Sequence, residues 1–357
     1  MMERDTLSFS QLMALLFGAL MGPAAELLPG AAAQAGMIGT LAVLGTGVAM
    51  AAAGFLLGDL AQCGGGLAQG LAEVFGRWGG RAVLLIYIVW CEVVLTLRLR
   101  LSAQRLLGSG ERDGAVWFFL LVLGLMALWM GHGHLGALGR AAQLFFVALV
   151  LTGGTVLLLA LFQVESGNLL STWSWSVDGA VGILRPSVNA LGYGLFAAFL
   201  FQPEREHKQR HRWISWVTGA CLVLAVAQMI VVGRYGPRLT GQLHSPFFQL
   251  AKSVGVEGAF QRVESLVAAV WVFSDFLLLT GILWCMRRIG AVLCPKIPAP
   301  TLVTIAALPA MVAALALFGE KASPREMEGN FLPVGSLILA LVVPALAILL
   351  KGRKRKK

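Results

Sequence analysis

The sequence predicts an all-α polytopic membrane protein with about ten transmembrane helices, arranged as a 5+5 inverted repeat whose first and sixth helices are broken. The first observation is composition: 58% of the residues are hydrophobic and only 13% are charged, about half the charged share of a soluble domain. The second is a series of apolar segments along the whole chain, separated by polar loops. The third is a pair of Gly- and Pro-containing breaks that lie about half a chain apart.

About ten apolar segments are each long enough to cross some 30 Å of hydrocarbon, which takes roughly 20 helical residues. They leave no room for a soluble domain, so 1–357 is expected to form a single membrane domain. Because each half then contains an odd number of spans, the second half is inverted relative to the first. We expect a first repeat over 1–162, a second over 183–350 and a basic cytoplasmic tail over 351–357. The expected spans are 9–29, 36–58, 81–101, 115–131, 141–162, 183–202, 213–234, 263–286, 301–319 and 332–350.

The first span is broken within residues 16–30, LFGALMGPAAELLPG, where Gly22 and Pro23 precede an acid, Glu26. A lipid-embedded backbone must satisfy its own N–H and C=O groups, so a broken helix is stable only inside protein or along a cavity. Corresponding breaks in two repeats indicate a transporter-type binding site near the bilayer midplane. Glu26 is therefore a candidate contact for a proton, a cation or a ligand ammonium. The alternative is a hydrated carboxylate at the end of the helix.

The sixth span is broken within residues 188–203, where Gly192, Tyr193 and Gly194 follow one another. Glycines allow the backbone to unwind, and the freed N–H groups at the start of a half-helix suit an anionic carboxylate. The alternative is close helix packing on small residues. The partner break in the first span favours the unwound form, so we expect these three residues and Gly22 near a ligand.

Two further acids lie inside predicted spans: Glu92 in LIYIVWCEVVLTL and Asp275 in VAAVWVFSDFLLLTG. Intramembrane acids are rare and by default mark ion or substrate paths. Glu92 is a candidate for a proton relay or a ligand contact. Asp275, next to Ser274 and five residues before Thr280, is typical of a small cation or proton site. For both acids the alternative is a structural contact between helices, worth about 1 kcal/mol in a bilayer.

Basic residues concentrate in three segments that the same topology places on one side of the membrane, 202–213, 286–296 and 351–357. The positive-inside rule then puts both termini in the cytoplasm. The net charge of +10 indicates contact of the tail with anionic lipid rather than with nucleic acid. On the opposite side, the loop 233–258 contains SPFFQLAKSVGV. Its apolar spacing after a Ser-Pro pair predicts a short amphipathic helix on the external face.

Nothing in the sequence indicates an enzyme, a metal site or a cofactor. The histidines of GHGH at 131–134 have no further ligands nearby for a metal. The glycine run CGGG at 63–66 follows no strand, as a dinucleotide-binding loop would. None of the five cysteines forms a CxxC pair, so they are expected to be small core residues rather than a disulfide framework.

Three stretches, taken in order, resemble a known family. Residues 250–284 carry Arg262 and Glu264 before an apolar span that contains a Trp. Residues 9–36 begin with a Gln near the start of a helix that ends in Leu-Pro, and 166–196 carry Asn-Leu-Leu ahead of the sixth span. In their content and order, these three stretches resemble the spore-germination receptor B subunits, or endospore germination permeases, of the amino acid–polyamine–organocation transporter superfamily.

The resemblance implies a LeuT-like fold and a membrane subunit of a nutrient-germinant receptor in the inner membrane of a bacterial endospore. Its partners would be the lipid bilayer, a larger A subunit, a lipoprotein C subunit and a small nutrient such as an amino acid, but no nucleic acid. The alternative functions are a proton- or sodium-coupled amino acid transporter and a scaffold that anchors partner subunits. The candidate ligand-binding residues are Gly22, Glu26, Glu92, Gly192, Tyr193, Gly194 and Asp275.

Overall fold

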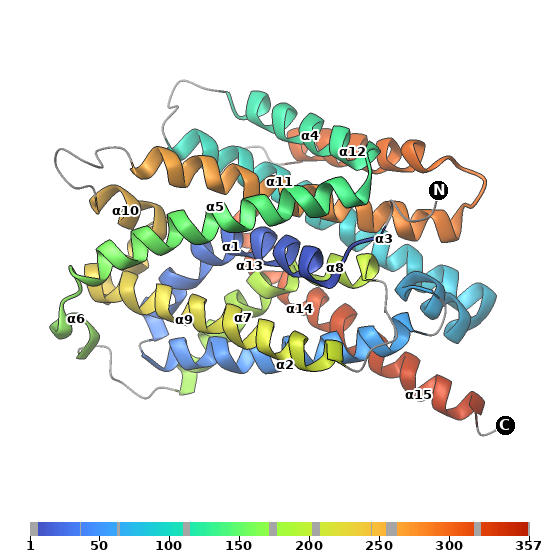
Figure 1. Ribbon diagram of the computed structural model, residues 1–357, viewed down its shortest axis with the longest axis horizontal. Coiled ribbons are helices and arrows are strands. Elements are labelled where there is room, and N and C mark those ends of the chain that lie inside the picture. Colours follow the sequence, from blue (N-terminus) through green and yellow to red (C-terminus); the bar gives the residue numbers. More distant parts are fainter. Residues whose placement is uncertain are drawn as a thin grey trace.

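The computed structural model describes residues 6–35, 37–62, 65–109, 115–170, 177–201, 208–243, 245–254, 263–317 and 323–355, which are nearly all helical and contain no strand (Figure 1). The elements are α1 (Phe9–Ala35), α2 (Met37–Ala61), α3 (Leu67–Ser109), α4 (Val116–His132), α5 (Leu135–Leu161), α6 (Ser166–Leu170), α7 (Val177–Gly192), α8 (Leu195–Leu200), α9 (Lys208–Gln242), α10 (Pro246–Ser253), α11 (Val263–Leu293), α12 (Ala299–Ala316), α13 (Pro324–Asn330), α14 (Leu332–Leu337), the π-helix η2 (Ile338–Val342) and α15 (Val343–Arg355).

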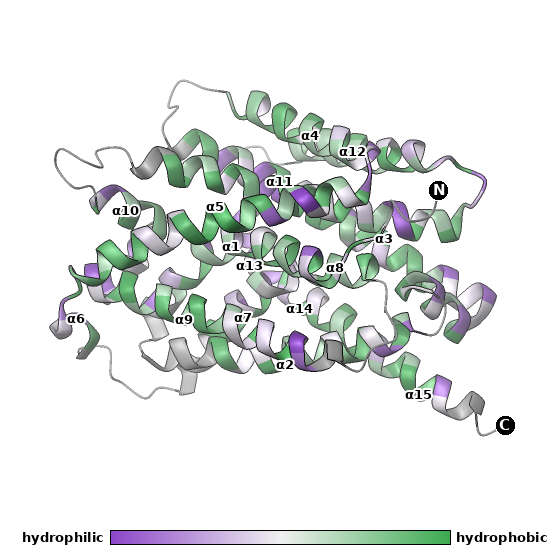
Figure 2. Cartoon of the chain, viewed as in Figure 1, coloured by the Kyte–Doolittle hydropathy of each residue, from purple (hydrophilic) through white to green (hydrophobic). Residues whose placement is uncertain are grey.

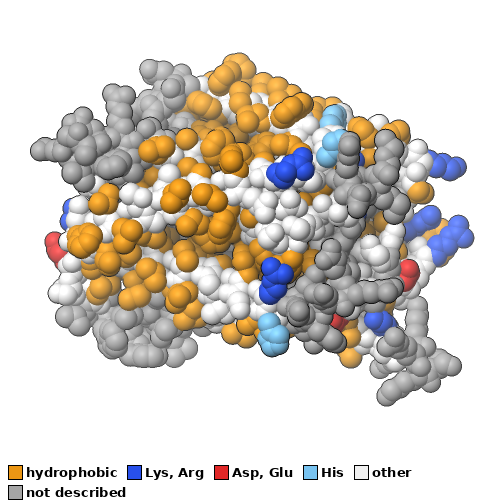
Figure 3. All heavy atoms as spheres, viewed as in Figure 1, with side chains coloured by type: hydrophobic (Ala, Val, Ile, Leu, Met, Phe, Trp, Pro, Cys, Tyr) orange, Lys and Arg blue, Asp and Glu red, His pale blue; other side chains and the backbone are white. Residues whose placement is uncertain are grey.

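The spans agree with the predicted plan. Within the described residues, nine helical stretches are long and apolar enough to cross a membrane, and α4 adds a shorter apolar helix. The long helices are predominantly hydrophobic along their length (Figure 2). Hydrophobic side chains also cover much of the described surface in the view of Figure 3. Large apolar side chains such as Leu151 on α5 and Trp129 on α4 are exposed at the surface of the bundle. An apolar surface of this extent is solvated by lipid, so the chain is an integral membrane protein.

α1 lies at the centre of the bundle and packs against α5, α7, α9 and α11. α1 and α11 are the most enclosed spans, whereas α5 is exposed along most of its length. Short α10 begins at Pro246, as the sequence predicted. It buries Phe247, Phe248 and Leu250 against the helices beside it, α1, α9 and α11. The predicted surface helix is therefore inserted into one end of the bundle.

The sixth span is interrupted where the sequence predicted it. α7 ends at Gly192, Tyr193 and Gly194 form a turn, and α8 starts at Leu195. This interruption frees backbone groups and side chains of the turn for contacts with neighbouring helices.

In the first span the helix continues through the predicted break, and a side chain of α11 hydrogen-bonds to its backbone there. The Ser274 hydroxyl accepts a hydrogen bond from the Gly22 N–H (3.0 Å) and donates one to the Gly18 carbonyl (2.5 Å). These two groups are i→i−4 partners in a regular helix. The next residue, Pro23, has no N–H to donate. The break therefore consists of one turn in which a side chain of another helix bridges the backbone.

The long helix α3 bends at a glycine, and the last span contains a π-helical segment. α3 starts well before its predicted span and turns at Gly76, whose φ of 76° favours glycine. In the last span, the π-helical segment leaves carbonyls without their usual donors, and the Tyr87 hydroxyl of α3 donates to the carbonyl of Leu339 at 2.7 Å. This hydrogen bond links α3 to the last span.

Close backbone approach between α2 and α3 yields a stability prediction. A Cβ added at Gly70 would lie 2.2 Å from the backbone oxygen of Leu60, whereas one at Gly58 would meet nothing within 4 Å. We expect Gly70→Ala to destabilise the protein by about 1–3 kcal/mol through overpacking. Gly58→Ala should be neutral or stabilise the helix by up to ~1 kcal/mol. Thermal unfolding in detergent compares the two variants, and equal stability of Gly70→Ala and wild type would contradict this packing.

Candidate functional site

A buried network of ion pairs joins α1, α3, α11 and α13. It contains three arginines and three acids, which are Glu26, Arg98, Arg105, Asp275, Arg325 and Glu328. Their formal charges cancel, and each acid contacts at least one arginine within 4 Å. The network therefore connects helices from both halves of the chain.

Arg98 on α3 lies at the core of the network and is completely buried. Its Nη1 donates to Glu328 Oε1 of α13 at 3.0 Å, and its Nη2 lies 3.5 Å from Asp275 Oδ1 of α11. The guanidinium also lies 5.0 Å from the centre of the Tyr193 ring, a cation–π distance. Such a buried cation is tolerated only because carboxylates and an aromatic face compensate its lost hydration.

Arg105, two helical turns farther along α3, extends the network to α1. Its Nη2 lies 2.6 Å from Asp275 Oδ1, and its Nη1 lies 3.6 Å from Glu26 Oε2. The guanidinium is 5.5 Å from the centre of the Trp271 ring. Arg325 on α13 donates to the other Glu26 oxygen at 3.1 Å. Because the Arg325 side chain is 42% exposed while that of Glu26 is 6% exposed, this pair forms the rim of the network.

The break in the sixth span contributes a polar side chain to the same network. The Tyr193 hydroxyl donates to Glu328 Oε1, the oxygen that also accepts from Arg98. The preceding Gly192 packs against α14: a Cβ there would lie 2.6 Å from Ser336 Oγ and 2.7 Å from Ser336 Cβ. The broken sixth span is thus joined to the start of the last span by one hydrogen bond and one glycine contact.

The predicted site residues divide into two groups. Glu26, Tyr193 and Asp275 belong to the network. Gly22 is joined to it through Ser274, the residue before Asp275, while Gly192 and Gly194 flank Tyr193. Glu92 on α3 makes none of the ion pairs described in this network. Its Oε1 is buried and has no hydrogen-bond partner within the described part of the chain.

Sequence reasoning missed the basic half of the network and one of its acids. Arg98 and Arg105 are seven residues apart, which places them on one face of a helix. That spacing, together with acids in other spans, is a signal for a buried charge network. Arg325 and Glu328 lie in a short segment before the last span and carry no comparable signal. Arg262 lies outside the described residues, as does the side chain of Glu264.

Among the described residues, no group of three or more His, Cys, Asp or Glu side chains is arranged to hold a metal ion. The side-chain groups that converge in the network are guanidinium, carboxylate and phenol groups. Their chemistry suits a ligand that itself carries an ammonium and a carboxylate, because each of its groups finds opposite charge in the network.

Solved structures of low sequence identity share this fold. A crystal structure of MhsT in complex with L-phenylalanine matches with a TM-score of 0.68 and 12% identity, covering 97% of this chain and 99% of that chain. Mhp1, a nucleobase-cation-symport-1 family transporter in a closed conformation with bromovinylhydantoin bound, matches with a TM-score of 0.65 and 12% identity, covering 97% and 92%. These similarities show that the chain has a LeuT-like fold.

Sequence comparisons identify the family. A search of curated protein sequences finds no match. A family model described as "Spore germination protein" matches residues 6–320, which is nearly the whole chain. The chain therefore belongs to the spore germination protein family of membrane permeases.

Proposed function

We propose that the chain is the membrane subunit of a nutrient-germinant receptor and that it binds a small nutrient such as an amino acid. It acts beside A and C subunits in the inner membrane of an endospore, with both termini on the cytoplasmic side. The nutrient binds among α1, α3, α11 and the turn between α7 and α8. The observation that supports this proposal most strongly is the buried ion network of a spore germination protein, at the turn that interrupts its sixth span.

The network holds its four helices in one arrangement. Separating α13 from α3 would break the pair between Arg98 and Glu328, and Glu328 would lose its arginine in a protein interior surrounded by lipid. Removing one partner of a buried ion pair typically costs about 3–5 kcal/mol, because the other charge is left uncompensated. The helices therefore stay together until another group takes the place of a lost partner.

A zwitterionic amino acid can supply both replacement groups at once. Its ammonium pairs with Asp275 or Glu328, and its carboxylate pairs with Arg98 or Arg105. The helices can then separate without creating an unpaired charge, and the net charge of the site stays unchanged. A ligand shifts a conformational equilibrium only by its difference in affinity between the two states. The open arrangement gains affinity because the ligand replaces pairs that opening has broken.

Deleting the gene in its native spore former and measuring germination against a nutrient panel tests the receptor function. We expect germination to fail with particular nutrients and to recover when the native gene is restored. Normal germination with every nutrient would overturn the proposal.

A proton- or sodium-coupled amino acid transporter is the second candidate function. Glu92 favours it, since an intramembrane carboxyl with a buried oxygen that lacks a hydrogen-bond partner among the described residues is typical of an ion path. Uptake of labelled amino acids into proteoliposomes under an imposed ion gradient separates the two functions. A receptor that only senses its nutrient shows no uptake.

The charge network makes a stability prediction. We expect Arg98→Gln to destabilise the protein by about 3 kcal/mol or more, because Glu328 and Asp275 lose their shared partner. Adding Glu328→Gln to this variant should recover part of the loss, since one uncompensated carboxylate is removed. Thermal unfolding in detergent measures both effects. Arg140→Gln, at an exposed position of α5, is the control and should change stability by less than ~0.5 kcal/mol. Strictly additive losses for Arg98→Gln and Glu328→Gln would contradict the pairing.

The glycine contact at the broken sixth span makes a prediction about the nutrient response. Gly192→Ala places a Cβ against Ser336, which moves the turn that holds Tyr193 on Glu328. We expect the nutrient concentration for half-maximal germination to rise by about tenfold, equivalent to ~1.4 kcal/mol. Adding Ser336→Gly should restore the response by opening the space. Gly182→Ala on the same helix meets nothing within 4 Å and serves as the control. A loss that Ser336→Gly does not rescue would show that packing against α14 is not the cause.

A further inference from the structure

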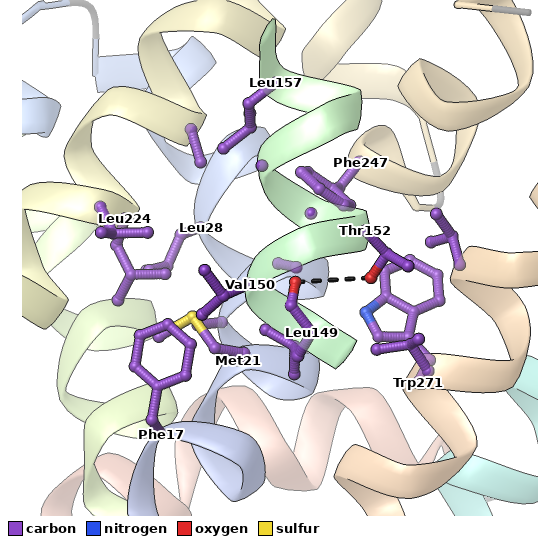
Figure 4. Close-up of a pocket in the computed structure, with 18 of the residues that line it drawn as sticks. Phe17, Met21, Leu28, Leu149, Val150, Thr152, Leu157, Leu224, Phe247 and Trp271 are labelled. Carbon is purple, nitrogen blue, oxygen red and sulfur yellow. Dashed lines mark hydrogen bonds between the residues drawn. The ribbon is translucent and has the colours of Figure 1, made fainter. Parts of the chain in front are cut away.

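An apolar cavity lies beside the ion network, since Trp271, which lines it, also lies against the Arg105 guanidinium. It has a volume of about 270 Å³ and is enclosed by α1, α5, α9, α10 and α11. Figure 4 shows Met21 and Leu28 of α1, Leu149 of α5, Leu224 of α9 and Trp271 of α11 around it. No residue of α3, α7 or α13 lines this cavity. None of the six charged residues of the network lines the cavity, and it contains no charged side chain.

One buried amide is the polar feature of this apolar cavity. Gln228 on α9 lines the cavity and is 1% exposed. Both its Oε1 and its Nε2 are buried without a hydrogen-bond partner in the described part of the chain. The hydroxyl of Thr152 already donates to the Ala148 carbonyl at 2.7 Å and lies 3.4 Å from the Leu149 carbonyl, the contact dashed in Figure 4. Burying an amide without hydrogen bonds costs free energy. Gln228 therefore offers a hydrogen-bond donor and an acceptor to a ligand that enters the cavity.

The cavity reaches the lipid-facing surface between α5 and α9. Val150 on α5 and Val223 on α9 line it, and they are 45% and 42% exposed. Both residues lie within helices that are long and apolar enough to span the membrane. A ligand therefore reaches the cavity from the hydrocarbon phase.

We propose that this cavity binds an uncharged amphiphile from the bilayer, an aliphatic chain with a single hydroxyl-type head group. The apolar wall excludes a charged head, because no side chain of the cavity compensates a charge. A hydroxyl donates to the Gln228 carbonyl oxygen and accepts from its N–H, so it satisfies both orphan atoms. Since an apolar cavity of about 150 Å³ holds benzene, this cavity accommodates a chain on the order of ten carbons.

Photolabelling of the purified full-length chain in lipid nanodiscs tests the proposal. The probe is a diazirine analogue of 1-decanol, and labelled peptides are identified by mass spectrometry. We expect saturable labelling on α5 around 149–157 and on α9 around 223–228. Unlabelled 1-decanol should compete at about fivefold lower concentration than decane, the factor expected from one hydrogen bond. Gln228→Leu, which replaces the amide with an apolar side chain of similar size, should abolish this difference between the two competitors.

A pair of glycine variants controls for changes in folding. Gly154 lines the cavity and a Cβ there meets nothing within 4 Å, so Gly154→Leu places an apolar side chain at the cavity wall. Gly219 on α9 is equally open but lies outside the cavity. Gly154→Leu should weaken labelling by about tenfold, whereas Gly219→Leu should leave it unchanged. Labelling that does not saturate, that persists in Gly154→Leu, or that decane and 1-decanol displace equally well would overturn the proposal. The binding measurement does not depend on the nutrient-receptor function.

Discussion

The pairing of Arg98 with two carboxylates is the constraint on which the rest of the structure depends. A completely buried guanidinium in a membrane bundle needs compensating charge, and its two acids come from α11 and α13. This requirement fixes the position of α3 relative to the last span, although Arg98 and Glu328 are 230 residues apart in the chain. Apolar packing alone would not define that position, because lipid tails are as apolar as the helices and solvate them equally well.

α11 couples this charge network to the backbone of α1. Adjacent residues of α11 make the two connections: Ser274 bridges Gly18 and Gly22, and Asp275 pairs with the arginines of α3. A rotation of α11 that breaks one connection therefore disturbs the other. Within α1, Glu26 joins the network and Met21 lines the apolar cavity. The first span thus contacts both the ion network and the apolar cavity.

The spans, the broken sixth helix and α10 could be predicted because each depends on local sequence: hydropathy over roughly 20 residues, or Gly and Pro at a few positions. The network could be predicted only in part. Asp275 and Glu26 stood out as acids in apolar segments, but Glu328 lies at the end of a span, where a charge is ordinarily hydrated. Arg98 likewise becomes significant only when its distant partners are known. Glu92 had the same local signal as Asp275, yet it lies apart from the ion pairs. The sequence could not distinguish the two acids, because local sequence does not say which face of α3 meets α11.

Charge balance bears on the choice between sensing and coupled transport. Three arginines and three acids compensate one another in the network, and a zwitterion adds no net charge to it. Binding such a ligand therefore requires no accompanying cation for electroneutrality, whereas a site with an excess acid would require one. Coupling to a proton would have to involve a group outside this balance, and Glu92 is such a group. The network by itself thus fits a ligand-operated conformational change, and an ion path in this chain would depend on the separate carboxyl of α3.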